Sequence, residues 1–202
     1  MLDLSLLEYA AIGFFAVTGA LMAAEKEMDI FGFILLGTVT GIGGGTIRDL
    51  LLGDVPIFWV KDPIFIIVCA SVSTLVFFAR EMPEQRLKLL LWLDAAGLAV
   101  FAIRGAHKAL AMGTGPTVAI IMGVITATFG GIIRDILGNE IPLILRREIY
   151  VTAAFIGVLV YLAGLYTLPP AVAAGLGMIV ALLVRVLAIQ FHWSLPTYKA
   201  KI

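Results

Sequence analysis

The sequence predicts an all-α membrane protein with seven transmembrane helices, six of which form two inverted three-helix repeats. Of its 202 residues, 61% are hydrophobic and only 14% are charged, against about 25% charged residues in a soluble globular domain. The mean hydropathy is +1.08, which excludes a soluble one-domain enzyme. The apolar residues form continuous runs instead of alternating with polar ones, which disfavours a closed β-barrel. In addition, one half of the chain repeats the pattern of the other.

Seven apolar stretches are each close to the roughly 20 residues that a helix needs to cross a bilayer. In chain order they cover about 5–24, 30–53, 63–80, 88–108, 116–138, 147–166 and 170–191. Short polar or turn-forming segments separate them: Glu25-Lys26-Glu27, Lys61-Asp62-Pro63, residues 80–88, Gly113 to Pro116, Arg146-Arg147-Glu148 and Pro169-Pro170. No connection is long enough for a separate domain, so we expect residues 1–202 to form a single transmembrane domain.

The basic residues between the spans predict the orientation, because lysine and arginine are enriched in cytoplasmic loops. An N-terminus outside and a C-terminus in the cytoplasm place eight basic residues on the cytoplasmic side: Lys26, Arg80, Arg86, Lys88, Arg146, Arg147, Lys199 and Lys201. Only Lys61 and Lys108 then lie on the outer side. We expect the chain to cross the membrane in this orientation.

An internal repeat is the strongest signal in the sequence. Residues 5–80 align with 91–166 without a gap at an offset of 86, with 18 identities in 76 pairs. Matched residues include Thr40 with Thr126, Gly44-Gly45 with Gly130-Gly131, Ile47-Arg48-Asp49 with Ile133-Arg134-Asp135, Pro56 with Pro142, and Glu8 with Asp94. Chance similarity between two apolar sequences does not easily supply this motif together with a proline seven residues after each aspartate.

Each repeat contains three spans, an odd number, so the two repeats cross the membrane in opposite directions. The expected arrangement is an inverted pair related by a pseudo-two-fold axis in the membrane plane. Transport sites in such proteins lie near the midplane, where helices are interrupted. The seventh span, about 170–191, lies outside the repeat and returns the chain to the cytoplasm.

The glycines in the second and fifth spans predict a kink or break in each helix, because glycine lowers helix stability. Backbone freed inside a bilayer is tolerated only where it is buried in protein or faces a water-filled cavity. Two such sites at matching positions, Gly44-Gly45 and Gly130-Gly131, favour a shared central cavity or pore. Close helix packing, which also prefers small residues, is the alternative.

Four charges lie within otherwise apolar spans, as Arg48-Asp49 and Arg134-Asp135. A charge at the bilayer centre costs about 2.5–3.5 kcal/mol, so such residues are usually paired. Neighbouring residues on a helix point about 100° apart. We therefore expect pairs between the repeats, Arg48 with Asp135 and Arg134 with Asp49. Each aspartate is also expected to cap a half-helix after the glycines. The charges hold the fold together, line and gate a pathway, or do both.

Glu8 and Asp94 begin the first and fourth spans. We expect Glu8 at the outer mouth of the pathway and Asp94 at the inner mouth, where carboxylates concentrate cations. Solvated interfacial acids are the alternative. Thr40 and Thr126, four residues before each glycine pair, either offer hydroxyls to an ion or bond to the carbonyl one turn earlier.

Little else in the sequence carries chemistry. Arg104 and His107 have no charged repeat equivalents and are candidates to adjust conduction, and Arg185 is expected to reach the interface or a lipid headgroup. No metal-ligand cluster, nucleophile–base pair or P-loop is present, so we predict neither an enzyme nor a cofactor. The net charge of zero gives no electrostatic basis for binding nucleic acid.

The doubled motif resembles that of a known family. Gly43 to Asp49 and Gly130 to Asp135 are similar to bacterial membrane proteins described as uncharacterised or as "glycine transporter" domains, the prokaryotic branch of the trimeric intracellular cation (TRIC) channels. The resemblance covers both repeats and the seventh span. It implies a seven-helix protomer, kinks at the paired glycines, a homotrimer and a potassium-permeable pore through each protomer.

The motif and the charge pattern together give the candidate pore or gate residues. These are Gly44, Gly45, Arg48, Asp49, Gly130, Gly131, Arg134, Asp135, Thr40 and Thr126, with Glu8 and Asp94 at the pore mouths. Potassium or sodium is the expected permeant ion, and the expected partners are membrane lipids and other copies of the chain.

Two other functions remain compatible with the residues. One is a secondary transporter of a small amino acid such as glycine, because inverted repeats with broken helices also suit alternating access. The other is a membrane scaffold without transport activity, which would have to account for four charges within the membrane at matched positions.

Overall fold

The computed structural model describes residues 4–79, 85–146 and 148–196, and in these residues it contains helices and no strand. The seven predicted spans correspond to α1 (Leu4–Glu25), α2 (Ile30–Leu52), α4 (Ile64–Phe78), α5 (Arg86–Ala111), α6 (Pro116–Leu137), α7 (Val151–Gly164) and α8 (Pro170–Phe191). Five of these, all except α4 and α7, are long and apolar enough to cross a membrane alone. The predicted all-α membrane fold is confirmed.

The third span of each repeat is shorter than predicted. α4 has 15 residues and α7 has 14, which at 1.5 Å per residue gives about 22 and 21 Å, less than the roughly 30 Å of a hydrocarbon core. A short helix that the sequence did not predict precedes each of them: α3 (Phe58–Lys61) before α4 and the 3₁₀ helix η1 (Leu143–Leu145) before α7. The chain therefore enters the third span of each repeat through an irregular segment.

The helix ends follow from local sequence. The Asp29 carboxylate accepts a hydrogen bond from the backbone N–H of Gly32 at 2.8 Å and so caps α2, as aspartate commonly does. Gly53 ends the same helix at a φ of 70°, a left-handed conformation that glycine adopts without steric cost. Pro116 and Pro170 stand at the starts of α6 and α8, where a missing N–H is tolerated.

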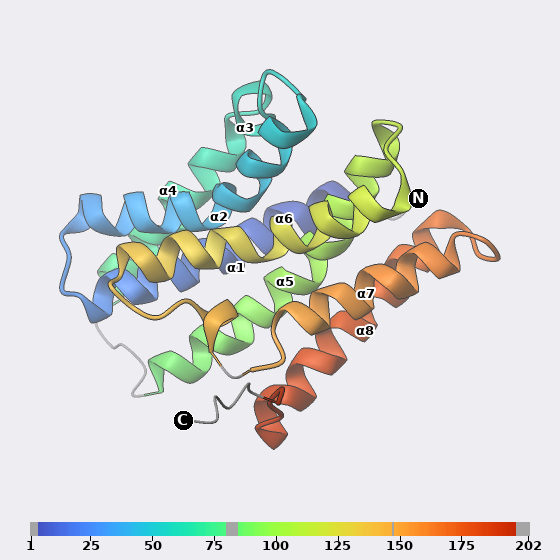
Figure 1. Cartoon of the computed structure of the whole chain (residues 1–202). Helices are drawn as coiled ribbons and strands as arrows, with labels where there is room; N and C mark the ends of the chain where they lie inside the picture. Colours follow the sequence, from blue (N-terminus) through green and yellow to red (C-terminus); the bar gives the residue numbers. More distant parts are fainter. Residues whose placement is uncertain (1–3, 80–84, 147, 197–202) are drawn as a thin grey trace, which may run out of the picture.

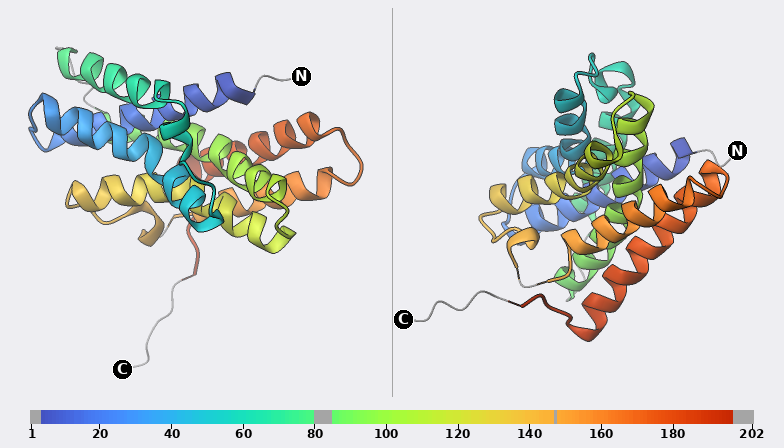
Figure 2. Two further views of the ribbon diagram at one scale, coloured as in Figure 1. Left: turned by 90° about the horizontal axis from the view of Figure 1, so that it is seen from above. Right: turned by 45° about the vertical axis from the view of Figure 1, so that its right-hand side comes forward.

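Four helices form the centre of the molecule: α1, α2, α5 and α6, each packed against its neighbours (Figure 1). α4 packs on α1 and α2, and α7, its repeat equivalent, packs on α5 and α6. α8 lies against α7 and α5, and the two views of Figure 2 show α7 and α8 as an antiparallel pair on one side of the bundle. The same packing scheme thus occurs twice, with α8 added to the second copy.

Polar contacts at the two ends of α1 confirm that the repeats are inverted. Near its start, the Tyr9 hydroxyl donates to Asp62, which follows α3, at 2.6 Å. Directly after its end, Lys26 donates to Glu140, which follows α6, at 2.7 Å. α1 has 22 residues, a length of about 33 Å. The segments that follow α2 and α6 therefore lie at opposite ends of the bundle.

Of the predicted kink or break at the glycines, a break is wrong, because α2 and α6 are each continuous α-helices through these positions. Figure 1 shows that α2 changes direction in its second half without being interrupted. A Cβ built on Gly44 would overlap the carbonyl oxygen of Thr126, and one built on Gly130 would overlap that of Thr40. These glycines allow the backbones of α2 and α6 to touch, as small residues do in membrane helices.

The loop charges divide into two groups as predicted. Lys26 and Arg146 both contact Glu140, at 2.7 and 3.9 Å. Lys61 and Lys108 both contact Asp54, at 2.7 and 2.6 Å, at the other end of the bundle. Arg80, Arg147, Lys199 and Lys201 lie outside the described residues. The grouping agrees with the expected topology, and the assignment of one end to the cytoplasm stays a prediction.

Candidate ion pathway

Each arginine of the repeated motif pairs with the aspartate directly after it. Arg48 donates from Nε and Nη2 to Oδ1 of Asp49, both at 2.8 Å, and Arg134 donates from Nε to Oδ1 of Asp135 at 2.9 Å. The predicted pairing between the repeats is wrong. An arginine side chain is long enough to reach the carboxylate of the next residue, although the two side chains leave the helix about 100° apart.

The second oxygen of each aspartate caps the short helix that follows. Oδ2 of Asp49 accepts from the N–H of Phe58, the first residue of α3, at 3.0 Å. Oδ2 of Asp135 accepts from the N–H of Leu143, the first residue of η1, at 2.9 Å. The predicted cap on a half-helix after the glycines is therefore wrong. Pro56 and Pro142 each follow the aspartate of their repeat by seven residues. They lie in the turns that these aspartates cap.

α2 and α6 cross where Gly44 and Gly130 meet the opposite helix. At one end of this crossing, Arg134 is the centre of a fully buried cluster. Its Nη1 donates to Oδ1 of Asp94 and to Oγ1 of Thr18, each at 2.9 Å. Arg134, Asp94 and Thr18 are all 0% exposed. Asp94 therefore lies in a closed cluster and does not line an open mouth. One arginine faces two aspartates, Asp94 and Asp135, so the ionised cluster carries one net negative charge.

Polar atoms converge beside Gly131 in this cluster. A Cβ built there would lie 3.2 Å from the Tyr150 hydroxyl, 3.4 Å from Asp94 Oδ1 and 3.5 Å from Arg134 Nη2. Among the described residues, the Tyr150 hydroxyl, Asp94 Oδ2 and Arg134 Nη2 have no hydrogen-bond partner. Donor and acceptor groups of Tyr150, Asp94 and Arg134 thus face one another inside a buried site. Sequence reasoning did not identify Thr18 or Tyr150 as members of this site.

At the other end of the crossing, a cavity of about 230 Å³ opens beside Glu8. Arg48, Arg104, His107 and Lys108 line it together with Glu8, and Glu8 accepts a hydrogen bond from Arg104. The Arg48 guanidinium also lies 5.6 Å from the centre of the Phe58 ring, a favourable cation–π distance. Glu8 therefore does line an opening, but as half of an ion pair.

The open and buried sites are repeat equivalents. The offset of 86 carries Glu8, Arg48 and Arg104 onto Asp94, Arg134 and Thr18. In the buried site the Thr18 oxygen accepts from Arg134. In the open site the matching residue is Arg104, which pairs with Glu8. One substitution between the repeats thus accounts for much of the asymmetry.

Lys108 connects the open site to the surface. Its Nζ lies 2.7 Å from Asp49 Oδ1 and 2.6 Å from Asp54 Oδ2, and Lys61 lies 2.7 Å from Asp54 Oδ1. Hydrogen bonds from Lys108 and Lys61 lower the pKa of Asp54 to about 2. At the other end, the hydrogen bond between Lys26 and Glu140 raises the pKa of Lys26 and lowers that of Glu140.

The threonines at the crossing bond to their own helices. The Thr40 hydroxyl donates to the Leu36 carbonyl at 2.5 Å, and the Thr126 hydroxyl donates to the Met122 carbonyl at 2.6 Å. This is the second of the two alternatives that the sequence left open. In the described part of the chain, no three His, Cys, Asp or Glu side chains are placed to hold a metal ion.

Two inverted helical repeats, crossing at glycines with buried charges on either side, define a membrane protein of the transporter and channel class. The sequence profile of the glycine transporter family matches residues 5–81 and 91–166, close to the bounds of the two repeats. Relatives of similar length include the UPF0126 inner membrane protein YadS of Escherichia coli K12, 47% identical over 195 residues that cover 95% of this chain and 94% of YadS. A UPF0126 membrane protein of Vibrio cholerae is 44% identical over 202 residues, 96% and 82% of the two chains.

Solved structures of TRIC channels share the fold. The TRIC orthologue from Rhodobacter sphaeroides superposes with a TM-score of 0.92 at 50% identity, over 96% of this chain and all of that one. A prokaryotic TRIC channel in 0.5 M KCl superposes with a TM-score of 0.87 at 33% identity, over 95% and 98% of the two chains. The chain belongs to the glycine transporter (UPF0126) family, and it shares the fold of solved TRIC cation channels.

Proposed function

We propose that this protein is a potassium-permeable cation channel of a bacterial inner membrane, a homotrimer with one pore through each protomer. The proposal rests mainly on one observation: the charged sites flank the helix crossing symmetrically. Arg48 follows Gly44 by four residues, and Arg134 follows Gly130 by four, about 6 Å along each helix. A path between α1, α2, α5 and α6 therefore meets a charged site on each side of the crossing.

The local charge balance favours cations over anions. Arg48 and Arg134 alone would repel a cation, but each is paired with its own aspartate. Asp94 adds a second carboxylate beside Arg134, so that site attracts a cation when ionised. Beside Glu8 the charge of Arg104 offsets the carboxylate. Fixed charges and dipoles attract cations into such a path, and conduction requires that this binding be weak enough for the ions to leave.

The asymmetry of the two sites supports a gate at the Asp94 end. Arg134 is 0% exposed and Tyr150 is 2% exposed, whereas Glu8 and Arg48 line a cavity. Opening requires that the Tyr150 ring, which Arg185 covers at 5.0 Å, separate from Asp94 and Arg134. The candidate pore and gate residues thus have different roles. The glycines allow α2 and α6 to cross closely, and the charged pairs determine the electrostatic potential on each side of the crossing.

The proposed homotrimer and the proposed orientation in the membrane are supported by observations outside the charged sites. The Rhodobacter sphaeroides orthologue is described as a trimeric channel, and this chain covers the whole of it. The excess of basic residues on the side expected to be cytoplasmic, eight against two, supports an N-terminus outside and a C-terminus in the cytoplasm.

Recording of purified protein in planar bilayers tests the proposal. We expect unitary currents whose reversal potential follows a potassium gradient. Glu8→Gln leaves Arg104 unpaired at the opening and should lower the conductance at low salt but not at high salt, because salt screens the charge. Arg104→Gln should have the opposite effect. The absence of unitary currents at any voltage, from protein that remains folded and trimeric, would contradict the proposal.

A second function is favoured by the site beside Gly131. Asp94 and Arg134, which bind each other in the closed site, offer charges of opposite sign to the ammonium and carboxylate groups of a zwitterion such as glycine once that site opens. One closed and one open end also suit alternating access. Saturable glycine uptake into liposomes, without unitary currents, would assign the protein to the transporters.

A further inference from the structure

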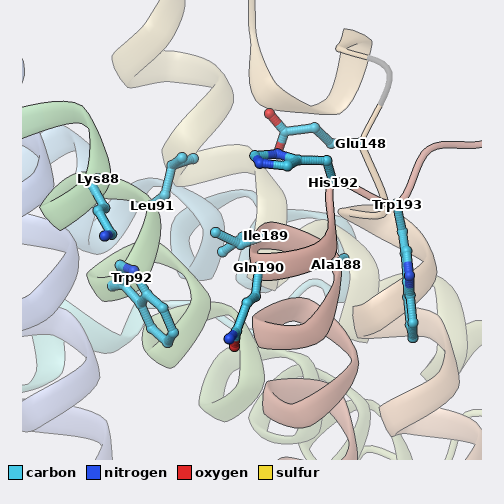
Figure 3. Close-up of a pocket in the computed structure, with 9 residues that line it drawn as sticks. All are labelled: Lys88, Leu91, Trp92, Glu148, Ala188, Ile189, Gln190, His192 and Trp193. Atoms are coloured by element: carbon cyan, nitrogen blue, oxygen red, sulfur yellow. The ribbon is translucent and has the colours of Figure 1, made fainter.

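A larger cavity lies away from the candidate pathway, between the first turns of α5 and the last turn of α8 (Figure 3). Its volume is about 680 Å³, within the roughly 300–1,000 Å³ range of small-molecule sites. The polar and aromatic side chains that line it are Lys88, Trp92, Glu148, Gln190, His192 and Trp193. None of these residues belongs to the sites beside Glu8 or Gly131.

The cavity lies at the depth where lipid headgroups meet the apolar core. Lys88 is in the first turn of α5, and Gln190 is in the last turn of α8, so both mark the ends of membrane-spanning helices. Trp92 and Trp193 are 38% and 45% exposed, and tryptophan is enriched at this interface. A ligand here would be in contact with headgroups and acyl chains at the same time.

The charge of the cavity suits an anion. Lys88 contributes one positive charge, and among the described residues its ammonium group makes no ion pair. Glu148 is paired with Arg185 at 2.7 Å, so Lys88 and Arg185 against Glu148 leave one net positive charge. Figure 3 shows Lys88 and Trp92 on α5 across the cavity from Ile189 and Gln190 on α8. An ammonium, an indole N–H and an amide can therefore donate into the same space.

One wall of the cavity continues into a lipid-facing surface. Leu91 and Ile189 line it, and Gln190 ends a strip of exposed apolar residues on α8. This strip includes Ile179, Leu183 and Leu187, which are 55%, 52% and 37% exposed and follow one another at helical spacing. An acyl chain attached to a group in the cavity can lie along this strip.

We propose that the cavity is a binding site for an anionic phospholipid. Its phosphate diester is held by Lys88, Trp92 and Gln190, and one acyl chain lies along the α8 strip. A basic residue near a membrane surface contributes about a five-fold preference for an anionic lipid. The site requires no ion conduction, so it stands or falls independently of the channel function.

Quenching of tryptophan fluorescence by brominated lipids tests the site. The chain has three tryptophans, so Trp59→Phe and Trp193→Phe leave Trp92 as the only reporter. In phosphatidylcholine vesicles, brominated phosphatidylglycerol should quench Trp92 at about a five-fold lower mole fraction than brominated phosphatidylcholine. Lys88→Gln should abolish this preference. Lys61→Gln, at the opposite end and bonded to Asp54, is the matched control and should retain it.

Four outcomes would overturn the proposal. Equal quenching by the two lipids would show that the cavity does not select an anion, and a preference that survives Lys88→Gln would place the selection elsewhere. Release of phosphatidylglycerol by millimolar glycerol phosphate would assign the cavity to soluble phosphate esters. Absence of quenching by either lipid would show that a second copy of the chain covers it.

Discussion

The two motif arginines have the same local pairing but different surroundings. Arg134 is fully buried and bonds to Thr18 and Asp94 as well as Asp135. Arg48 bonds to Asp49 and lines a cavity, and Asp49 has a second cationic partner in Lys108. Residues at equivalent positions of the repeat therefore contribute unequally to stability.

Arg134→Ala should destabilise the protein by about 3 kcal/mol or more, because it leaves two buried carboxylates without their cation. Arg48→Ala is the matched control and should cost clearly less, because Lys108 still neutralises Asp49. Unfolding in mild detergent, followed by circular dichroism, measures both. Adding Asp94→Asn to Arg134→Ala should restore part of the loss, and equal losses for the two single variants would contradict this account.

At the scale of the helices, the crossing of α2 and α6 determines where every charged site lies. Its geometry depends on Gly44 and Gly130, each of which faces a threonine carbonyl of the other helix. α7 and α8 also touch through glycines. Cβ atoms built on Gly157 and Gly177 would each lie 2.8 Å from the carbonyl oxygen of the other residue. Helix association in this protein thus relies on direct backbone contact.

Gly44→Ala and Gly130→Ala should each lower the free energy of unfolding by about 1–3 kcal/mol, because the added methyl group forces α2 and α6 apart. Gly13→Ala is the control. It also lies in a membrane helix, but a Cβ there meets nothing within 4 Å, so the change should be neutral or slightly stabilising. Thermal unfolding of the three variants in one detergent gives the comparison, and a similar loss in Gly13→Ala would contradict it.

The salt bridges around Asp54 join the segment after α2 to the end of α5, and they depend on pH. The pKa of Asp54 is lowered from 3.8 to about 2, so its contribution to stability is fully present above about pH 4. It is lost as the pH falls through 2. The melting temperature should therefore exceed that of Asp54→Asn at pH 5, and the difference should shrink toward pH 2. A difference that does not change with pH would contradict the assignment.

The sequence predicted the elements better than their contacts. The apolar lengths and the repeat were sufficient for the seven spans and the inverted topology. α3 and η1, of four and three residues, are too short to show any periodicity. Each motif aspartate is held in place by a backbone N–H of the following turn and binds its arginine with the other oxygen. The sequence does not show these turns, so it could not show the pairing. Glycines within a helix are compatible with a kink, a break or close packing, and the sequence does not contain the neighbouring backbone that favours packing at Gly44 and Gly130.

At the scale of the whole molecule, the topology can be measured with a matched pair of positions. Val55 and Ile141 are repeat equivalents, 68% and 65% exposed, and the native Cys69 is buried. A membrane-impermeant thiol reagent should label Val55→Cys from outside intact cells, and Ile141→Cys only after the membrane is opened. Labelling of both from the same side would contradict the inverted repeat, and the reverse pattern would invert the proposed orientation.

The polar contacts between the repeats can form only after the second repeat has been synthesised. Glu8, Thr18 and Lys26 find their partners 96, 116 and 114 residues later in the chain. At translation rates of about 5–20 residues per second, this delay is on the order of ten seconds. Until then Glu8 lacks its partner Arg104, and Lys26 lacks its partner Glu140. We therefore expect the first repeat, produced without the second, to be less stable in the membrane than the same residues in the complete chain.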